Sequence, residues 1–222
     1  MGYEHDILRW LHVIAFGYWI GGELGVFHAA HMIVNPALPL DERLRHMEVA
    51  YRIDIVHRFA IIYLLGLGLQ MGHDLGIQPL GGAWLAGMWA LIGVWTWLTW
   101  MTFAKRGSDL GLLLTRIDDR IRYVLMPLLI AVGIVSLVTG GPLGAKWYAV
   151  KVTLFGALFA IGLFMRRMMQ RWIVFFRQMK TQGPSQEIEN ALTRDMRIGV
   201  RLAYVYWIGI ITVAFFGVVK PF

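Results

Sequence analysis

The chain has 222 residues, of which 58% are hydrophobic and only 16% are charged, and its mean hydropathy is +0.58. This composition excludes an ordinary soluble domain and is typical of an integral membrane protein. Because the chain has no cysteine, disulfides, thiolate metal sites and iron–sulfur clusters held by this chain alone are excluded. The net charge of +7 does not indicate a nucleic-acid partner, because the basic residues lie between apolar runs and so report membrane topology.

A transmembrane helix needs about 20 apolar residues, and six runs of the chain meet this requirement. They are residues 7–34, 55–76, 83–103, 121–139, 147–165 and 202–219. The N-terminus lacks the basic start and small-residue cleavage site of a signal peptide, so we expect the first run to be a mature helix. The sequence predicts an all-α polytopic transmembrane bundle of about six helices, with residues 1–222 as one integral membrane domain.

Lysine and arginine are concentrated in alternate connections. They fill or border the stretches after the first, third and fifth runs, and the only others are Arg9, Lys146, Lys151 and Lys220. The positive-inside rule therefore predicts that these three connections are cytoplasmic and that both termini lie on the periplasmic side of a bacterial inner membrane. The stretch 166–201 begins RRMMQRWIVFFRQMK, which fits either an amphipathic helix on the leaflet or a fifth helix that continues past the membrane.

All seven histidines lie in the first third of the chain: His5, His12, His28, His31, His46, His57 and His73. If imidazole holds a haem or a metal, the first two helices must supply the ligands. The strongest candidates are His12 and His57. Because His12 and His28 are sixteen residues apart, they point to opposite faces of one helix. A single haem b is therefore easier to build than two.

The other histidines are weaker candidates for cofactor ligands. His28 and His73 are further candidates for cofactor binding, one toward the inner and one toward the outer side. His31 fits an ordinary interfacial residue, and we expect His5 and His46 to be solvated because they lie in polar stretches.

One face of the first helix carries His12, Trp19 and Glu23, which are spaced by seven and four residues. An ionisable residue deep in a membrane helix normally faces the bundle interior and marks a functional site. Glu23 is expected to relay a proton or to hydrogen-bond a cofactor or its ligand; the alternative is an ion pair with Lys151 that only fixes the packing. Lys151 either reaches out to the interface or faces the bundle. Arg58 is a candidate partner for a haem propionate or a lipid phosphate.

A glycine spacing and a methionine-rich stretch each have a structural interpretation. Gly68, Gly72 and Gly76 recur every four residues and predict close helix approach. The methionines in FMRRMMQRW suggest a Cu(I) site, but methionine in a membrane helix is more often packing.

Two motifs resemble a known group of membrane proteins. The stretch LHVIAFGYWIGG gives His12-x6-Trp19-x2-Gly22, and WYAVKVTLFGALFAIGLFMRR gives Trp147-x3-Lys151 followed by arginines. They resemble the first and the lysine-bearing helices of HemJ-type protoporphyrinogen oxidases and CopD-like membrane proteins. The resemblance implies a helix bundle with b-type haem, His12 as a haem ligand, Trp19 as its packing or redox neighbour and Lys151 as a site residue.

The chain departs from the HemJ type at two positions. Those proteins usually carry an arginine in the inner half of the first helix, where this chain has ELGVF, and a histidine about three turns after the lysine, where it has Gly162. This chain also has an additional C-terminal helix.

The leading hypothesis is a haem b membrane redox protein that passes electrons between a quinone pool and a partner subunit or a soluble donor. Three alternatives stay open. They are a HemJ-like protoporphyrinogen oxidase, a CopD-like copper transport or resistance protein, and a cofactor-free structural subunit of a membrane complex. The lipid bilayer is the partner common to all four.

Overall fold

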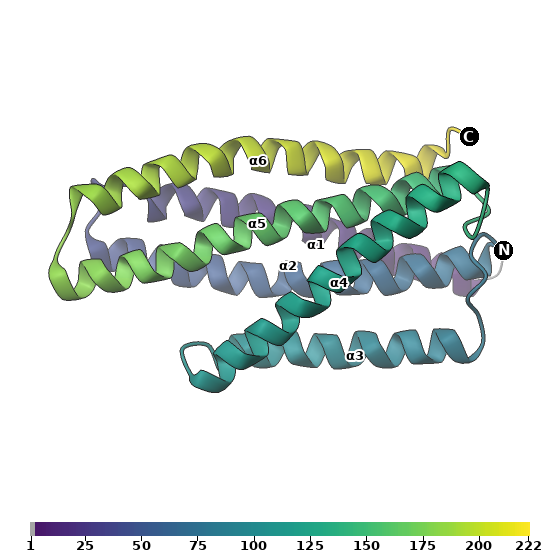
Figure 1. The fold of residues 1–222 in the computed structure, drawn as a ribbon, viewed down its shortest axis with the longest axis horizontal. Helices are drawn as coiled ribbons and strands as arrows, with labels where there is room; N and C mark the ends of the chain where they lie inside the picture. Colours follow the sequence, from purple (N-terminus) through teal and green to yellow (C-terminus); the bar gives the residue numbers. More distant parts are fainter. Residues whose placement is uncertain (1–2) are drawn as a thin grey trace.

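The structure, a computed structural model, describes residues 3–222, and this part of the chain forms six α-helices and no strand (Figure 1). The helices are α1 (Tyr3–Ile33), α2 (Leu40–Asp74), α3 (Ala83–Ala104), α4 (Asp109–Thr139), α5 (Lys146–Gln182) and α6 (Gln186–Val219). Each of the six predicted runs falls on one of these helices, so the prediction of an all-α bundle is confirmed.

Among residues 3–222, five helices are long and apolar enough to cross a membrane; α3 is the exception. Helix α3 has 22 residues and contains no charged side chain, which makes it about 33 Å long at the standard helical rise. Its many tryptophans, such as Trp84 and Trp97, depress its mean hydropathy, although an aromatic side chain is well tolerated near the membrane interface. A sixth membrane crossing by α3 therefore stays a prediction.

The helices run back and forth, so the two ends of the bundle differ (Figure 1). Both termini lie at one end, together with the α2–α3 and α4–α5 connections; we call this the terminal end. The other three connections lie at the opposite end, which we call the arginine-rich end. Helices α1, α2, α5 and α6 form the main bundle, α3 lies along its edge, and α4 crosses obliquely from α3 to α5. Which end faces the cytoplasm stays a prediction.

Four helices, α2, α4, α5 and α6, extend well beyond their predicted apolar runs at the arginine-rich end. Helix α5 runs on to Gln182, so the alternative of a separate amphipathic helix is wrong. The reason is packing: Trp172 and Phe176 on this extension are buried against Ile33 of α1 and Leu192 of α6. The apolar side of this amphipathic extension is therefore buried between helices and not on a lipid surface, and this burial stabilises α5 as one continuous helix.

An ion pair fixes this extension. Arg43 of α2 donates to both carboxylate oxygens of Glu189 in α6, at 2.6 and 3.0 Å, and its Nε donates to the carbonyl oxygen of Ile33 at 2.7 Å. The Arg43 guanidinium also lies over the Phe176 ring, 4.9 Å from its centroid. A bidentate contact of this kind ties α1, α2 and α6 in one geometry.

Glycines allow two close helix contacts. A Cβ at Gly133 of α4 would overlap the Thr153 side chain and lie 2.8 Å from the carbonyl oxygen of Ala149, so only glycine lets α4 lie this close to α5. At Gly72 of α2, a Cβ would lie 2.6 Å from the Tyr148 hydroxyl of α5. The predicted role of Gly72 in close approach is therefore confirmed. Gly76 follows the helix in a left-handed turn with φ +69° and meets no neighbour, so for Gly76 that prediction is wrong.

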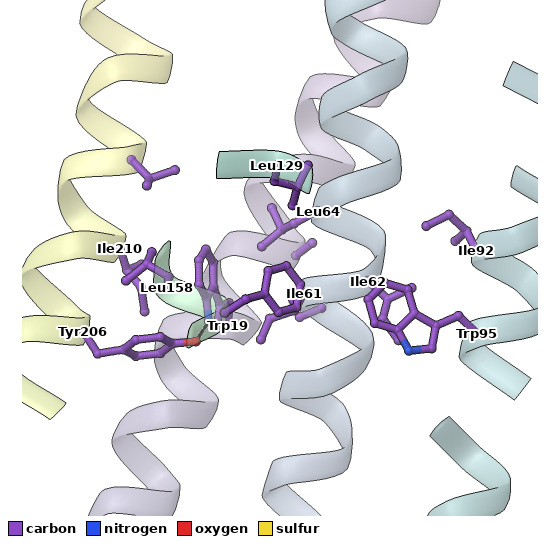
Figure 2. Packing of buried hydrophobic residues seen from close by; sticks show 14 of the residues in the cluster. Trp19, Ile61, Ile62, Leu64, Ile92, Trp95, Leu129, Leu158, Tyr206 and Ile210 are labelled. Carbon is purple, nitrogen blue, oxygen red and sulfur yellow. Dashed lines mark hydrogen bonds between the residues drawn. The ribbon is translucent and has the colours of Figure 1, made fainter. Parts of the chain in front are cut away.

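The main apolar core lies at mid-bundle, where α1, α2, α5 and α6 meet (Figure 2). Trp19 is nearly fully buried there, and its Nε1 donates a hydrogen bond to the Tyr206 hydroxyl of α6 at 3.2 Å. Ile61, Leu158 and Ile210 pack around this pair (Figure 2). Large apolar side chains also cover the outside of the helices, as hydrocarbon surroundings require.

Candidate functional site

Polar side chains enter the bundle at two depths, one on either side of the Trp19 core. Toward the terminal end, His12 of α1 faces α2, and its Cε1 lies 3.5 Å from the position that a Cβ on Gly68 would take. The Tyr148 hydroxyl of α5 donates to the Gly68 carbonyl oxygen at 3.1 Å. The Nδ1 of His12 is buried and has no hydrogen-bond partner among the described residues. We call this region the outer site.

Lys151 of α5 belongs to the same site. It follows Tyr148 by one turn, and its ammonium lies within electrostatic range of His12. The Nζ packs against Gly217 of α6, where a Cβ would lie only 2.7 Å away. Within residues 3–222, no carboxylate forms an ion pair with Lys151. The outer site therefore combines an imidazole nitrogen that lacks a partner with an ammonium that lacks a counter-ion.

The second region, the inner site, lies toward the arginine-rich end and contains Glu23 and His57. Their side chains are 13% and 7% exposed, and Glu23 Oε1 lies 3.1 Å from His57 Nε2. The His57 Nδ1 is buried and without a hydrogen-bond partner in the described chain. His57 packs on Gly22, where a Cβ would lie 2.8 Å from the His57 Cβ, so glycine permits this approach.

The two sites are separate. Because His57 packs at the level of Gly22, it lies ten residues along α1 from His12, which corresponds to about 15 Å. One iron needs both axial nitrogens within a few ångströms of each other on opposite sides of one ring. The structure thus does not bring His12 and His57 together as a ligand pair.

An ionic cluster continues the inner site toward the arginine-rich end. Asp118 of α4 is fully buried; it accepts a hydrogen bond from Trp95 Nε1 at 2.7 Å and pairs with Arg122 at 3.2 Å and Arg166 at 2.5 Å. Arg166 also reaches Asp119 at 3.2 Å. One acid is thus shared by two arginines from α4 and α5, which compensates the desolvation of all three groups.

The cluster is joined to Glu23 and His57 through α2. Arg58 pairs with Asp54 at 2.5 Å and lies within electrostatic range of Asp118. Asp54 lies one turn from His57 and within electrostatic range of both His57 and Glu23. Charged groups from four helices therefore form one connected buried system.

The predicted stripe on α1 is confirmed, since His12, Trp19 and Glu23 all point into the bundle. The alternative pairing of Glu23 with Lys151 is wrong, because the two residues lie in different sites and Glu23 contacts His57. Arg58 faces Asp54, so a protein carboxylate already occupies the anion-binding role expected of it.

Four further histidines lie apart from the two sites. His28 is exposed on α1 and reaches neither site. His73 packs its imidazole against Gly81 beyond the end of α2. His5, in the first turn of α1, and His46, near the start of α2, are both partly exposed, so their solvation stays a prediction.

The ionic cluster was missed at the sequence level. A signal was present, because Asp54 and Arg58, like Asp118 and Arg122, are spaced four residues apart and so share a helix face. Arg166 carried no such signal, since it joins the cluster through contact between helices.

Fold and sites together define a polytopic helical membrane protein with ionisable groups buried at two depths. Comparisons with protein-family models, curated proteins and solved structures found no match. Among residues 3–222, no group of three or more His, Asp or Glu side chains is arranged to hold a metal ion.

Proposed function

We propose that the protein is a haem b-binding membrane redox protein and that His12 in the outer site would hold the haem iron. The observation that supports this proposal is that an imidazole nitrogen and an ammonium group of the outer site both lack a partner among the described residues. A neutral imidazole with a free nitrogen suits haem iron, and a buried ammonium without a counter-ion suits a propionate carboxylate. His12 and Lys151 together therefore match the two kinds of group that a haem presents. The haem supplies one-electron chemistry when bound.

Leaving a buried ammonium without a partner costs several kcal/mol of free energy in an apolar interior. Lys151 lies on α5 beside Gly217 of α6, where no acidic side chain is available. A carboxylate-bearing ligand removes this cost. The same two residues, His12 and Lys151, carry the resemblance to the HemJ-type and CopD-like proteins.

The surrounding residues would define the environment of the group. Gly68 and Gly217 keep two of the facing helices free of side chains at this depth. Tyr148 closes the site against α2, and the Trp19–Tyr206 pair separates it from the inner site. Apolar burial of this kind excludes water and favours electron transfer over reaction with solvent.

As a redox protein, it would exchange electrons with a membrane quinone and with a partner subunit or a soluble donor. The arginine-rich end faces the cytoplasm of a bacterial inner membrane in this proposal, as the positive-inside rule predicts.

A HemJ-like protoporphyrinogen oxidase is a second candidate. The observation that favours it is the shared site of His12 and Lys151, which lie 139 positions apart in the chain. Rescue of a strain that lacks protoporphyrinogen oxidase activity would support this reaction, and failure of an expressed, folded protein to rescue it would count against it.

The haem proposal is tested by the optical spectrum of the purified protein after expression with added haem. We expect a b-type reduced-minus-oxidised spectrum and about one haem per chain by the pyridine haemochrome assay. Lys151→Met should retain iron ligation but weaken haem retention, whereas Lys146→Met, at the exposed start of α5, should not. A folded wild-type protein without a b-type spectrum would overturn the proposal.

A further inference from the structure

We propose that Glu23 and His57 form a proton-exchange site that holds one proton between them and is served from the arginine-rich end. The pair is defined by the 3.1 Å contact between the Glu23 carboxylate and the His57 imidazole, both nearly buried. This inference depends on the inner site alone and not on haem binding.

The buried charges around the inner site balance only when the pair holds one proton. The connected cluster contains three arginines and three aspartates, which balance: Arg58, Arg122, Arg166, Asp54, Asp118 and Asp119. Glu23 is the remaining acid, and His57 is its direct partner. Because a net charge is costly to bury, one proton on either Glu23 or His57 makes the whole site neutral. The same proton can sit on the carboxylate or on the imidazole.

Charged and titratable groups of α2, α4 and α6 face the pair. From α2 these are Asp54 and Arg58, from α4 Arg122, and from α6 the Tyr206 hydroxyl. Arg166 of α5 acts on the pair through Asp54. The arginines are held by aspartates, and the Tyr206 hydroxyl, which accepts from Trp19, keeps its own proton because a tyrosine ionises only at high pH. Glu23 and His57 are thus the two groups free to exchange a proton.

The surroundings of the pair differ between the two ends of the bundle. Toward the terminal end, the pair meets the packed core of Trp19, Ile61 and Leu158 (Figure 2). Tyr18 of α1 is exposed on the outside of the helix, so the next titratable group of α1 inside the bundle in that direction is His12.

Toward the arginine-rich end, Asp54 lies one turn away and is paired with Arg58, which is within electrostatic range of Asp118 and Asp119 of α4. Ionised side chains therefore lie on this side of the pair, whereas the core on the other side offers the Tyr206 hydroxyl and apolar groups, as at the closed end of a half-channel. The proton comes from water at the arginine-rich end and returns there, so no oxidant or reductant is needed.

The test is an infrared pH titration of the purified protein in lipid nanodiscs, between about pH 5 and pH 9, the range in which a shared Glu–His proton is expected to titrate. We expect a protonated-carboxyl band that disappears as the pH rises. Glu23→Gln should abolish this band, and Glu48→Gln, at a half-exposed acid of the same end, should leave it unchanged. A wild-type spectrum without the band, or a band that persists in Glu23→Gln, would overturn the proposal.

Sidedness is tested with the unmodified protein in vesicles of uniform orientation. A rapid pH change at the arginine-rich face should alter the Glu23 band faster than the same change at the other face, because the ionised carriers lie on that side. Equal rates from both faces would contradict the half-channel.

Discussion

Asp118 offers the sharpest test of the buried ionic cluster. The carboxylate is 0% exposed and is shared by Arg122, Arg166 and the indole of Trp95. The change Asp118→Asn keeps a similar shape and an oxygen that can accept from Trp95. It removes the negative charge that compensates two buried guanidinium groups.

Removing one partner of a buried ion pair costs about 3–5 kcal/mol of unfolding free energy, because the remaining charge is left uncompensated. For a chain of this length, that corresponds to a fall in melting temperature on the order of 10 °C. Asp119 limits the loss, since it already contacts Arg166 at 3.2 Å. The double variant Asp118→Asn/Arg166→Gln restores the charge balance and should recover a measurable part of the loss.

The assay is thermal unfolding in detergent, followed by far-ultraviolet circular dichroism. Asp109→Asn, at the exposed start of the same helix, serves as the control and should cost less than about 1 kcal/mol. Asp118→Asn with the stability of the control, or a double variant less stable than the single one, would refute the reasoning.

Three further predictions concern packing and topology. Gly133→Ala should lower the unfolding free energy by about 1–3 kcal/mol, because the added methyl group overlaps α5. Gly87→Ala, which has open space around it, should leave the unfolding free energy unchanged. Equal melting temperatures of the two variants would contradict the close helix contact. Arg43→Lys should cost about 1–3 kcal/mol in the same unfolding assay, because lysine cannot keep the two-point contact with α6. Alkaline phosphatase fused after Phe222 should be active, and the same enzyme inserted at 105–108 inactive; the reverse would invert the topology.

Much of the fold could be predicted because hydropathy and helical periodicity are local properties. The six apolar runs and the stripe of His12, Trp19 and Glu23 follow from counting along one helix. The extension of α5 to Gln182 did not follow, because its apolar residues suit a lipid surface as well as a neighbouring helix. Only the contact of Phe176 with α1, α2 and α6 decides between them.

The site was predicted less well, because its contacts also depend on how the helices pack against one another. Glu23 could be identified as buried from its own helix, but its partner depends on the register between α1 and α2. Gly22 sets this register by letting His57 approach at that level. The depth difference between His12 and His57, and the meeting of Arg166 with Asp118, likewise arise from tertiary packing that no local pattern encodes.

The central claim is that His12, and not His57, binds haem, because the two histidines lie in different sites. The most direct measurement is haem per chain in His12→Ala and His57→Ala, purified in parallel with the wild-type protein. We predict loss of the b-type spectrum in His12→Ala and haem retention in His57→Ala. Full haem content in His12→Ala, or loss confined to His57→Ala, would contradict the account.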